Sequence, residues 1–176
     1  MALSGSLAKT RRFPMKKKNI EKTNVMRILE QHKINYTSYC YIDSGVISGI
    51  DVAVVLNQNP EQVFKTLVTA GNSNINYVFL VPVNQGLDLK KAAKSVGEKN
   101  ISMIKSKDLL PLTGYIHGGC SPIGMKKQFK TVIDLSAMNF DTIIFSGGKI
   151  GYQVETSLDG LKKVISFDLA DIREAP

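Results

Sequence analysis

The sequence has few of the side chains that usually bind metals. Its 176 residues include only two cysteines, Cys40 and Cys120, and two histidines, His32 and His117. Neither a CxxC pair nor a zinc-ligand spacing occurs among them. We therefore expect no metal site, and no motif in the chain indicates an organic cofactor.

Long hydrophobic segments are absent as well. No apolar run approaches the roughly 20 residues that a membrane helix needs, and the first residues, MALSGSLAKTRRFP, lack the continuous apolar core of a secretory signal. Two isolated cysteines without such a signal indicate a reducing, cytoplasmic setting. The hydrophobic content of 43% and the charged content of 22% are ordinary for a soluble globular protein. A chain of 176 residues is long enough for one domain with a sizeable core.

Acidic residues are fewer than basic ones, 15 against 23, so the formal net charge is +8. We interpret residues 1–14 as a vector-derived leader, because MKKKNIEKTNVMRILEQ, which starts at Met15, reads as a natural beginning. Removing the three leader cations, Lys9, Arg11 and Arg12, lowers the charge from +8 to +5. Residues 15–176 would then form the domain. Their basic surplus fits either a polyanion partner or an ordinary soluble protein.

Hydrophobic periodicity predicts more strands than helices. Helices are expected over 21–33, 48–60 and 87–97, with one helical turn in SKDLLPL and a short helix in SLDGLKKV. Strands are expected over 35–42, 62–71, 76–83, 101–104, 130–135 and 141–148, in the segment that follows GKIG, and in VISFDL. Ser48 and Asp51 resemble a helix capping box. Because hairpins are common and strict βαβ alternation is missing, we expect a mixed α/β (α+β) single domain. Its mixed, partly barrel-like β-sheet would be surrounded by helices.

The glycine-rich stretch GYIHGGCSPIGMKKQFKTVID, residues 114–134, allows two kinds of chemistry. In the first, Cys120 is a nucleophile and His117 its base. A spacing of three residues does not by itself create such a dyad, and no cysteine-protease signature surrounds the cysteine, so the pattern disfavours a hydrolase of this type. In the second, the backbone around Gly118 and Gly119 approaches a ligand closely and cradles an oxyanion, phosphate or carbonyl. Lys126 and Lys127 then follow within reach of a polyanion, although a structural hairpin with two solvated lysines remains an equal alternative.

Two further stretches carry polar side chains at the ends of apolar runs. Lys65 lies within VFKTLV, where a solvated surface lysine is the commoner arrangement and a lysine placed in a pocket the rarer one. Ser146 begins the turn SGGKIG, which is either a plain hairpin or the hydrogen-bonding rim of a small-ligand site. Each of these signals is weak alone.

Taken together, the stretches FKTL, LKKAAKS, TGYIHGGCSPIGMKK, TVID and FSGGKIG, in this order and spacing, resemble the YbaK/ProX family of trans-acting aminoacyl-tRNA editing domains. The similarity runs from residue 21 to 172 and is greatest to the YbaK branch, the Cys-tRNA(Pro) deacylases. It implies deacylation of Cys-tRNA(Pro), and also of Cys-tRNA(Cys), in the cytoplasm, either on free mischarged tRNA or beside prolyl-tRNA synthetase as a partner. The substrate's own thiol would attack its ester carbonyl and leave as a cyclic thiolactone. The protein would hold the reacting groups at attacking distance and stabilise the oxyanion.

The resemblance also implies roles for particular residues. Lys65 matches the essential lysine, which orients the aminoacyl ester or the terminal adenosine, and Gly119 matches the glycine whose backbone approaches the substrate carbonyl. These two would be the catalytic positions. The substrate-binding positions would be Tyr41, Thr66, Gly118, Ser146 and Gly147. On this reading the turn binds the substrate, and Cys120 is a packing residue.

The sequence departs from the family pattern at three positions. Some members have an aromatic residue at Ser48, an aliphatic residue at Cys120, or an aspartate at Gln153. These departures bear on the amino-acid specificity more than on the reaction class. Three alternatives stand beside the deacylase of cysteinyl-tRNA: a deacylase for another small amino acid, such as Ala-tRNA(Pro), with water as nucleophile; a non-catalytic RNA-binding or regulatory protein of the same fold; and the Cys120–His117 hydrolase.

Overall fold

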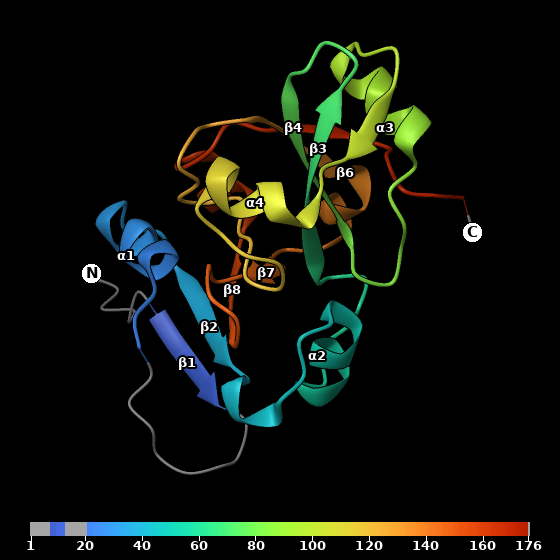
Figure 1. The fold of residues 1–176 in the computed structure, drawn as a ribbon. Coiled ribbons are helices and arrows are strands. Elements are labelled where there is room, and N and C mark those ends of the chain that lie inside the picture. The colour runs from blue at the N-terminus through green and yellow to red at the C-terminus, as the bar shows by residue number, and fades with distance from the viewer. Residues whose placement is uncertain (1–7, 13–20, 176) are drawn as a thin grey trace.

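The computed structural model describes residues 8–12 and 21–175, and within them nine strands form two β-sheets accompanied by five α-helices (Figure 1). Both termini of the described chain lie at its surface. None of the helices in this part of the chain has the length and apolarity that crossing a bilayer requires.

The first sheet has four strands in the order β1-β2-β8-β7. Its members are β1 (Ala8–Arg12), β2 (Tyr36–Cys40), β8 (Tyr152–Thr156) and β7 (Ile143–Ser146). Strands β2, β8 and β7 pair antiparallel, whereas β1 pairs parallel with β2. The sequence did not predict β1, which falls inside the expected leader; the rest of residues 1–14 lies outside the described residues.

The second sheet has five strands in the order β5-β3-β4-β6-β9. They are β5 (Ile101–Met103), β3 (Phe64–Gly71), β4 (Asn76–Pro82), β6 (Lys130–Asp134) and β9 (Asp168–Ala170). The hairpin of β3 and β4 is confirmed, and β6 and β9 extend the sheet by parallel pairing. Strand β4 is buried along nearly its whole length, as its apolar sequence NYVFLVP requires for a central strand.

The helices are α1 (Asn24–Gln31), α2 (Gly49–Val55), α3 (Leu89–Val96), α4 (Ser106–Thr113) and α5 (Leu158–Lys162). Helix α3 ends at Gly97, where the predicted helix over 87–97 also ends, in the left-handed region at φ 72°. At its start, Asp88 accepts hydrogen bonds from two main-chain N–H groups. The expected capping box at α2 does not form, because the Ser48 side chain makes no cap hydrogen bond. Helix α4 is also longer than the single turn expected, and it contains Pro111.

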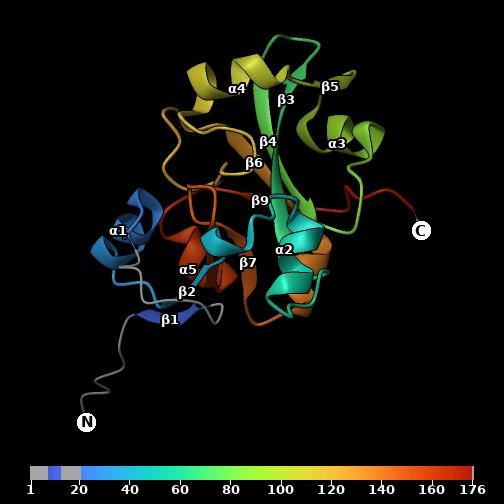
Figure 2. The same cartoon turned by 60° about the horizontal axis from the view of Figure 1, so that its bottom comes forward.

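The mixed α/β class is confirmed, but the two sheets do not close into a barrel, in contrast to the partly barrel-like sheet expected. Strands β3 and β7 meet only at an isolated parallel bridge between Val63 and Ile144, where the Ile144 N–H donates to the Gln62 carbonyl at 3.0 Å. Val63 and Ile144 belong to a small apolar cluster with Ala53 and Val83, whereas the large cluster of the core includes Phe64, Val68 and Phe145. Figure 2 shows α2 and α4 as separate elements flanking the strands, and Figure 1 shows α3 apart from both.

Candidate active site

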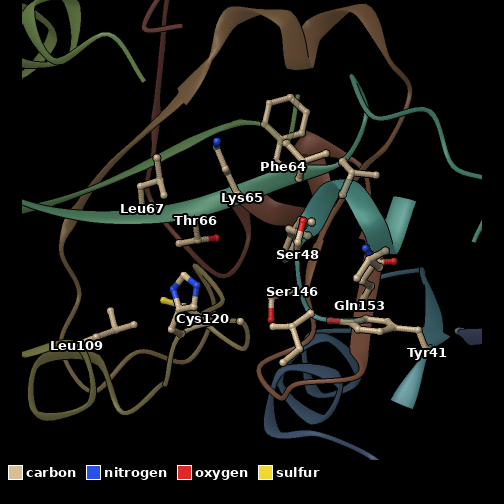
Figure 3. A pocket seen from close by; sticks show the side chains of 18 residues that line it. Tyr41, Ser48, Phe64, Lys65, Thr66, Leu67, Leu109, Cys120, Ser146 and Gln153 are labelled. Carbon is tan, nitrogen blue, oxygen red and sulfur yellow. The ribbon is translucent and has the colours of Figure 1, made fainter. Parts of the chain in front are cut away.

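A cavity of about 220 Å³ lies at the start of β3, where the chain enters the second sheet. Segments far apart in the sequence line it: Tyr41 after β2, residues 47–49 and Val52 of α2, residues 63–67 around the start of β3, Val83, Leu109 of α4, the turn residues 117, 118 and 120, Phe145 and Ser146 of β7, and Gln153 of β8. Its walls are mainly apolar with a few polar groups, as is typical of small-ligand sites. Figure 3 shows Leu109 on one side and Ser48 on the other.

The edge of β3 is open at this cavity. Strand β5 pairs only with the end of β3, residues 69–71. The Val68 carbonyl accepts from Ile104 on the β5 side at 3.3 Å, whereas the Val63 carbonyl accepts from Val83 on the β4 side at 2.8 Å. Because successive residues of a strand present their main-chain groups to alternate sides, the N–H and C=O of Thr66 face the open edge. The cavity therefore borders a main-chain donor and acceptor as well as side chains.

The Thr66 hydroxyl is buried without a hydrogen-bond partner. Three buried side-chain polar atoms are in this condition among the described residues, and Thr66 alone of the three residues lines the cavity. An unsatisfied buried hydroxyl costs about 1–3 kcal/mol, so a ligand group that pairs with it would recover that free energy. In Figure 3 the side chains of Thr66 and Ser146 face the same space.

Lys65 lines the cavity from the other face of β3. It pairs across the strand with Val81, and Figure 3 shows its ammonium pointing away from Thr66. The side chain is partly buried, and this desolvation lowers the pKa of Lys65, while the negative charge of Glu174 opposes the shift. The lysine is thus an edge group of the cavity with a partly desolvated charge.

The turn after β7 orients Ser146. Its Oγ accepts from the Gly148 N–H at 3.2 Å, and the Gly147 N–H donates to the Tyr152 carbonyl at 2.9 Å. A side chain on Gly147 would lie 3.2 Å from the Tyr152 Cβ. Gly147 does not line the cavity. Its lack of a side chain allows the turn to pack closely against Tyr152.

The glycine-rich turn contributes Gly118 directly and Gly119 only indirectly. Gly118 has φ 85°, a left-handed conformation, and a Cβ there would lie 2.7 Å from the Ile47 Cγ2. The Gly119 N–H donates to the Ile116 carbonyl at 3.0 Å, and a Cβ at Gly119 would lie 3.0 Å from the Ile150 nitrogen. Gly119 is not among the lining residues. Its approach to a substrate carbonyl stays a prediction, and the contact with the second glycine turn gives it a packing role.

Tyr41 and Gln153 form the wall nearest β2 and β8. Burial raises the pKa of Tyr41, so its phenol is a neutral donor or acceptor. Gln153 is 4% exposed and accepts a hydrogen bond at 2.8 Å from the amide of Gln58, which follows α2. No spacing rule indicates Gln58, because α2 and β8 meet only in the folded chain. No carboxylate lines the cavity among the described residues, which is consistent with the departure at Gln153.

The cysteine and the histidine do not form a catalytic pair. Burial raises the pKa of Cys120 to about 12, so it is a neutral thiol at physiological pH. No hydrogen bond joins Cys120 and His117 in the described part of the chain, although both line the cavity. In the same part of the chain, no three His, Cys, Asp or Glu side chains gather closely enough to hold a metal ion. The arrangement can bind and polarise a small ester, with no protein nucleophile evident.

The site therefore brings together five of the residues that the sequence predicted: Tyr41, Lys65, Thr66, Gly118 and Ser146. The apolar walls were not predicted. Val52, Phe64 and Phe145 line the cavity, but the pattern alone marks them only as core residues of a helix and two strands.

Comparisons with known proteins identify the family of the chain. The model of the aminoacyl-tRNA editing domain matches residues 47–164, more than half of the chain. EbsC of Enterococcus faecalis, provisionally named a Cys-tRNA(Pro)/Cys-tRNA(Cys) deacylase, is 46% identical over 158 residues, which cover 89% of this chain and 96% of EbsC.

Two solved structures share the fold. One, described provisionally as a trans-editing enzyme for prolyl-tRNA synthetase, has a TM-score of 0.75 at 23% identity and covers 86% of this chain and 95% of its own. The other, hypothetical protein APE2540, has a TM-score of 0.78 at 18% identity and covers 86% of this chain and 100% of its own. On the family model and the identity to EbsC, the chain belongs to the aminoacyl-tRNA editing domain family.

Proposed function

We propose that this protein is a trans-acting deacylase of Cys-tRNA(Pro), active also on Cys-tRNA(Cys). The family and the 46% identity to EbsC support this activity. The observation that carries it is the cavity, in which the unpartnered hydroxyl of Thr66 and the side chain of Ser146 face the same space among apolar walls.

The reaction that fits such a cavity needs no protein nucleophile. The substrate's sulfur attacks its own ester carbonyl and forms a C–S bond. The tetrahedral intermediate then collapses with cleavage of the C–O bond to the terminal ribose. The thiol proton passes to the departing ribose oxygen, and the products are a cyclic thiolactone and free tRNA. The Cys120 thiol, held neutral by burial, has no part in these steps.

The protein's contribution is binding, orientation and charge stabilisation. The Thr66 hydroxyl and its open main-chain N–H are donors for the carbonyl oxygen as negative charge develops on it. Ser146 and Tyr41 orient the aminoacyl group, and Lys65 makes a charged contact with the ester or the terminal adenosine from the rim. A small, apolar-walled cavity favours a compact side chain such as that of cysteine.

The test is deacylation of preformed Cys-tRNA(Pro), Cys-tRNA(Cys), Ala-tRNA(Pro) and Pro-tRNA(Pro) by the purified protein and by Lys65→Ala. We expect rapid loss of cysteine from both cysteinyl-tRNAs, thiolactone among the products, and a rate about 100-fold lower in the variant. Lys90→Ala, at an exposed lysine of α3, is the matched control and should keep the full rate. Loss of alanine instead would assign water as the nucleophile. No loss from any substrate by a folded sample would overturn the deacylase and leave an RNA-binding role.

We further propose that prolyl-tRNA synthetase directs the protein to tRNA(Pro), in the cytoplasm where tRNA is charged. The solved structure described as a trans-editing enzyme for that synthetase supports the partnership by its fold. Adding the synthetase should raise the rate on Cys-tRNA(Pro) relative to Cys-tRNA(Cys). An unchanged ratio would contradict the partnership and leave the deacylase itself intact.

A further inference from the structure

The two walls of the cavity differ in charge. On one side, α4 and the loop after it carry Lys105, Lys107, Lys126 and Lys127, all exposed. None of these four takes part in an ion pair within the described residues. We call them the lysine wall.

The opposite wall is built from α2 and the segments around it, and it has no cation. No lysine or arginine occurs from residue 34 to residue 64, whereas Asp43, Asp51 and Glu61 are exposed there. Its exposed apolar side chains include Ile50, 45% exposed, and Val54, 74% exposed. This wall offers nothing that would attract a phosphate.

The lysine wall is continuous with the cavity. Helix α4 contributes Leu109 to the lining, and the following turn contributes His117, Gly118 and Cys120. The loop is fastened to the end of α4, because the Lys126 N–H donates to the Thr113 carbonyl at 3.0 Å. The Lys126 side chain also lies over Gly114, with its Cγ 3.2 Å from where a Cβ would stand. Lys105 and Lys107 mark one end of α4, and Lys126 and Lys127 lie by the other.

We propose that the 3′ strand of the tRNA leaves the cavity across α4, with its phosphates against the lysine wall. The inference rests on the proposed function, because it takes an aminoacylated tRNA as the occupant of the cavity. Helix α4 is about 12 Å long at about 1.5 Å per residue, which spans about three nucleotides of a stacked strand at the duplex rise of about 3.4 Å each, and fewer of an extended strand. Unpaired, exposed ammonium groups at both ends of that span neutralise phosphates without reading sequence.

This path explains two features of the sequence together. The sequence alone did not decide whether Lys126 and Lys127 are solvated surface residues or bind a ligand. In the structure they belong to the same segment as the turn that lines the cavity. The apolar and acidic wall around α2 lies off the path, so the terminal adenosine enters from the α4 side. The protein contacts the backbone of the acceptor end, and no base-reading element is required.

The experiment compares two charge-neutralising variants with a matched control. Lys126→Gln/Lys127→Gln and Lys105→Gln/Lys107→Gln alter the lysine wall. Lys90→Gln/Lys94→Gln removes the same charge from two exposed lysines of α3, which contributes no residue to the cavity and lies away from α4 (Figures 1 and 2).

Two substrates separate the tRNA path from the chemistry: Cys-tRNA(Pro), and cysteinyl-adenosine, which has the ester but no phosphate. For each lysine-wall variant we expect KM on the tRNA to rise about 10-fold at about 0.1 M salt with kcat unchanged. The slope of log(kcat/KM) against log[salt] should fall by about one for each lost phosphate contact. Turnover of cysteinyl-adenosine, and the α3 variant on both substrates, should match the wild type.

Three outcomes would overturn the path. If the lysine-wall variants keep the wild-type KM on tRNA, the 3′ strand lies elsewhere. If KM rises equally in the α3 variant, the effect comes from the net charge of the protein and not from the lysine wall. An effect seen only when prolyl-tRNA synthetase is present would make the wall a protein-docking surface. If the wild type cleaves neither substrate, the proposed function fails. The path is then still tested by the Kd of uncharged tRNA(Pro), which the two lysine-wall variants alone should raise.

Discussion

Two buried polar groups of the second sheet, Asp134 at the end of β6 and Thr66 on β3, are treated in opposite ways by the fold. The carboxylate of Asp134, a residue only 1% exposed, accepts main-chain N–H groups of Ser136 at 3.0 Å, Ile172 at 3.0 Å and Arg173 at 3.3 Å. Thr66 has a buried hydroxyl with no partner. A satisfied group of this kind holds a structure together, whereas an unsatisfied one at a cavity is available to a ligand.

The surroundings of Asp134 and Thr66 agree with a structural role for the first and a binding role for the second. Asp134 fastens the C-terminal segment, which continues with hydrogen bonds from the Asp88 N–H to the Ile172 carbonyl and from the Glu174 N–H to the Gly86 carbonyl, both at 2.8 Å. Thr66 pairs with Leu80 of β4 on one side, but on its other side β3 has no neighbouring strand at this point. The second sheet thus combines a closed polar cluster at β6 with an open edge at β3, and we propose that the substrate binds at the open edge.

The strongest test of the comparison is Asp134→Ala. It leaves three main-chain donors without their acceptor, so the free energy of unfolding should fall by about 3 kcal/mol. Chemical denaturation measures this, with Asp141→Ala, at an exposed acid before β7, as the control. A loss no larger than in the control would mean that the cluster does not hold the C-terminal segment.

Thr66→Val should have the opposite consequence. We expect kcat on Cys-tRNA(Pro) to fall about 100-fold, as when an oxyanion donor is removed, with the denaturation midpoint unchanged or slightly raised. Thr69→Val is the matched control on the same strand, because the Thr69 hydroxyl donates to the Tyr77 carbonyl at 3.1 Å. That control should lose stability and keep its activity. Equal effects of the two variants on kcat would remove the distinction between Thr66 and Asp134.

The Asp134 cluster also predicts a dependence on pH. Burial alone would raise the pKa of Asp134, but the N–H groups of Ile172 and Ser136 and the charge of Arg173 hold it below its ordinary value. The stabilisation is therefore complete above the unfolded pKa of about 3.9 and is lost as the pH falls through the lower folded pKa. Between the wild type and Asp134→Asn, the gap in unfolding free energy should be constant from pH 7 to about pH 5 and narrow below about pH 4. A gap as wide at pH 3 as at pH 7 would contradict the shift.

Cys120→Ala should change deacylation little. The buried thiol is protonated and takes no part in the proposed reaction, so kcat should stay within about twofold, with a stability loss of about 1 kcal/mol for the smaller side chain. His117→Ala should likewise leave kcat on cysteinyl-adenosine unchanged. A loss of activity in both variants would restore the cysteine–histidine hydrolase as the better interpretation.

The smallest effect is expected from a chain that starts at Met15. If residues 1–14 are a vector-derived leader, its deacylation rate and denaturation midpoint should equal those of the full chain. Because Ala8–Arg12 pairs with β2, a lower midpoint would show that this strand belongs to the working fold. The same measurement decides whether residues 15–176 are sufficient as the editing domain.

Much of the local structure could be predicted from the sequence. Two-residue and helical periodicities located most strands and helices, and the expected end of the 87–97 helix matches the end of α3 at Gly97, because these signals act over a few residues. The expected cap at Ser48 failed, since that side chain lies at the cavity and makes no cap hydrogen bond. The open edge of β3 could not be predicted from the sequence, because it depends on the length of β5 and on the position of β7 in the folded chain.

The residues of the site were predicted through resemblance to a family, and the structure shows which of them line the cavity. Lys65, Thr66 and Ser146 reached one cavity, whereas Gly119 has its N–H engaged within the turn and packs on Ile150. By itself, the sequence determined the helices and strands, the glycine-rich turns and the excess of lysine, because each follows from residues close together in the chain. Only the tertiary structure decided which polar groups were left unpaired and that one wall of the cavity is cationic, because hydrogen-bond satisfaction and charge placement depend on contacts between segments that lie far apart in the chain, such as Asn35 and Thr156.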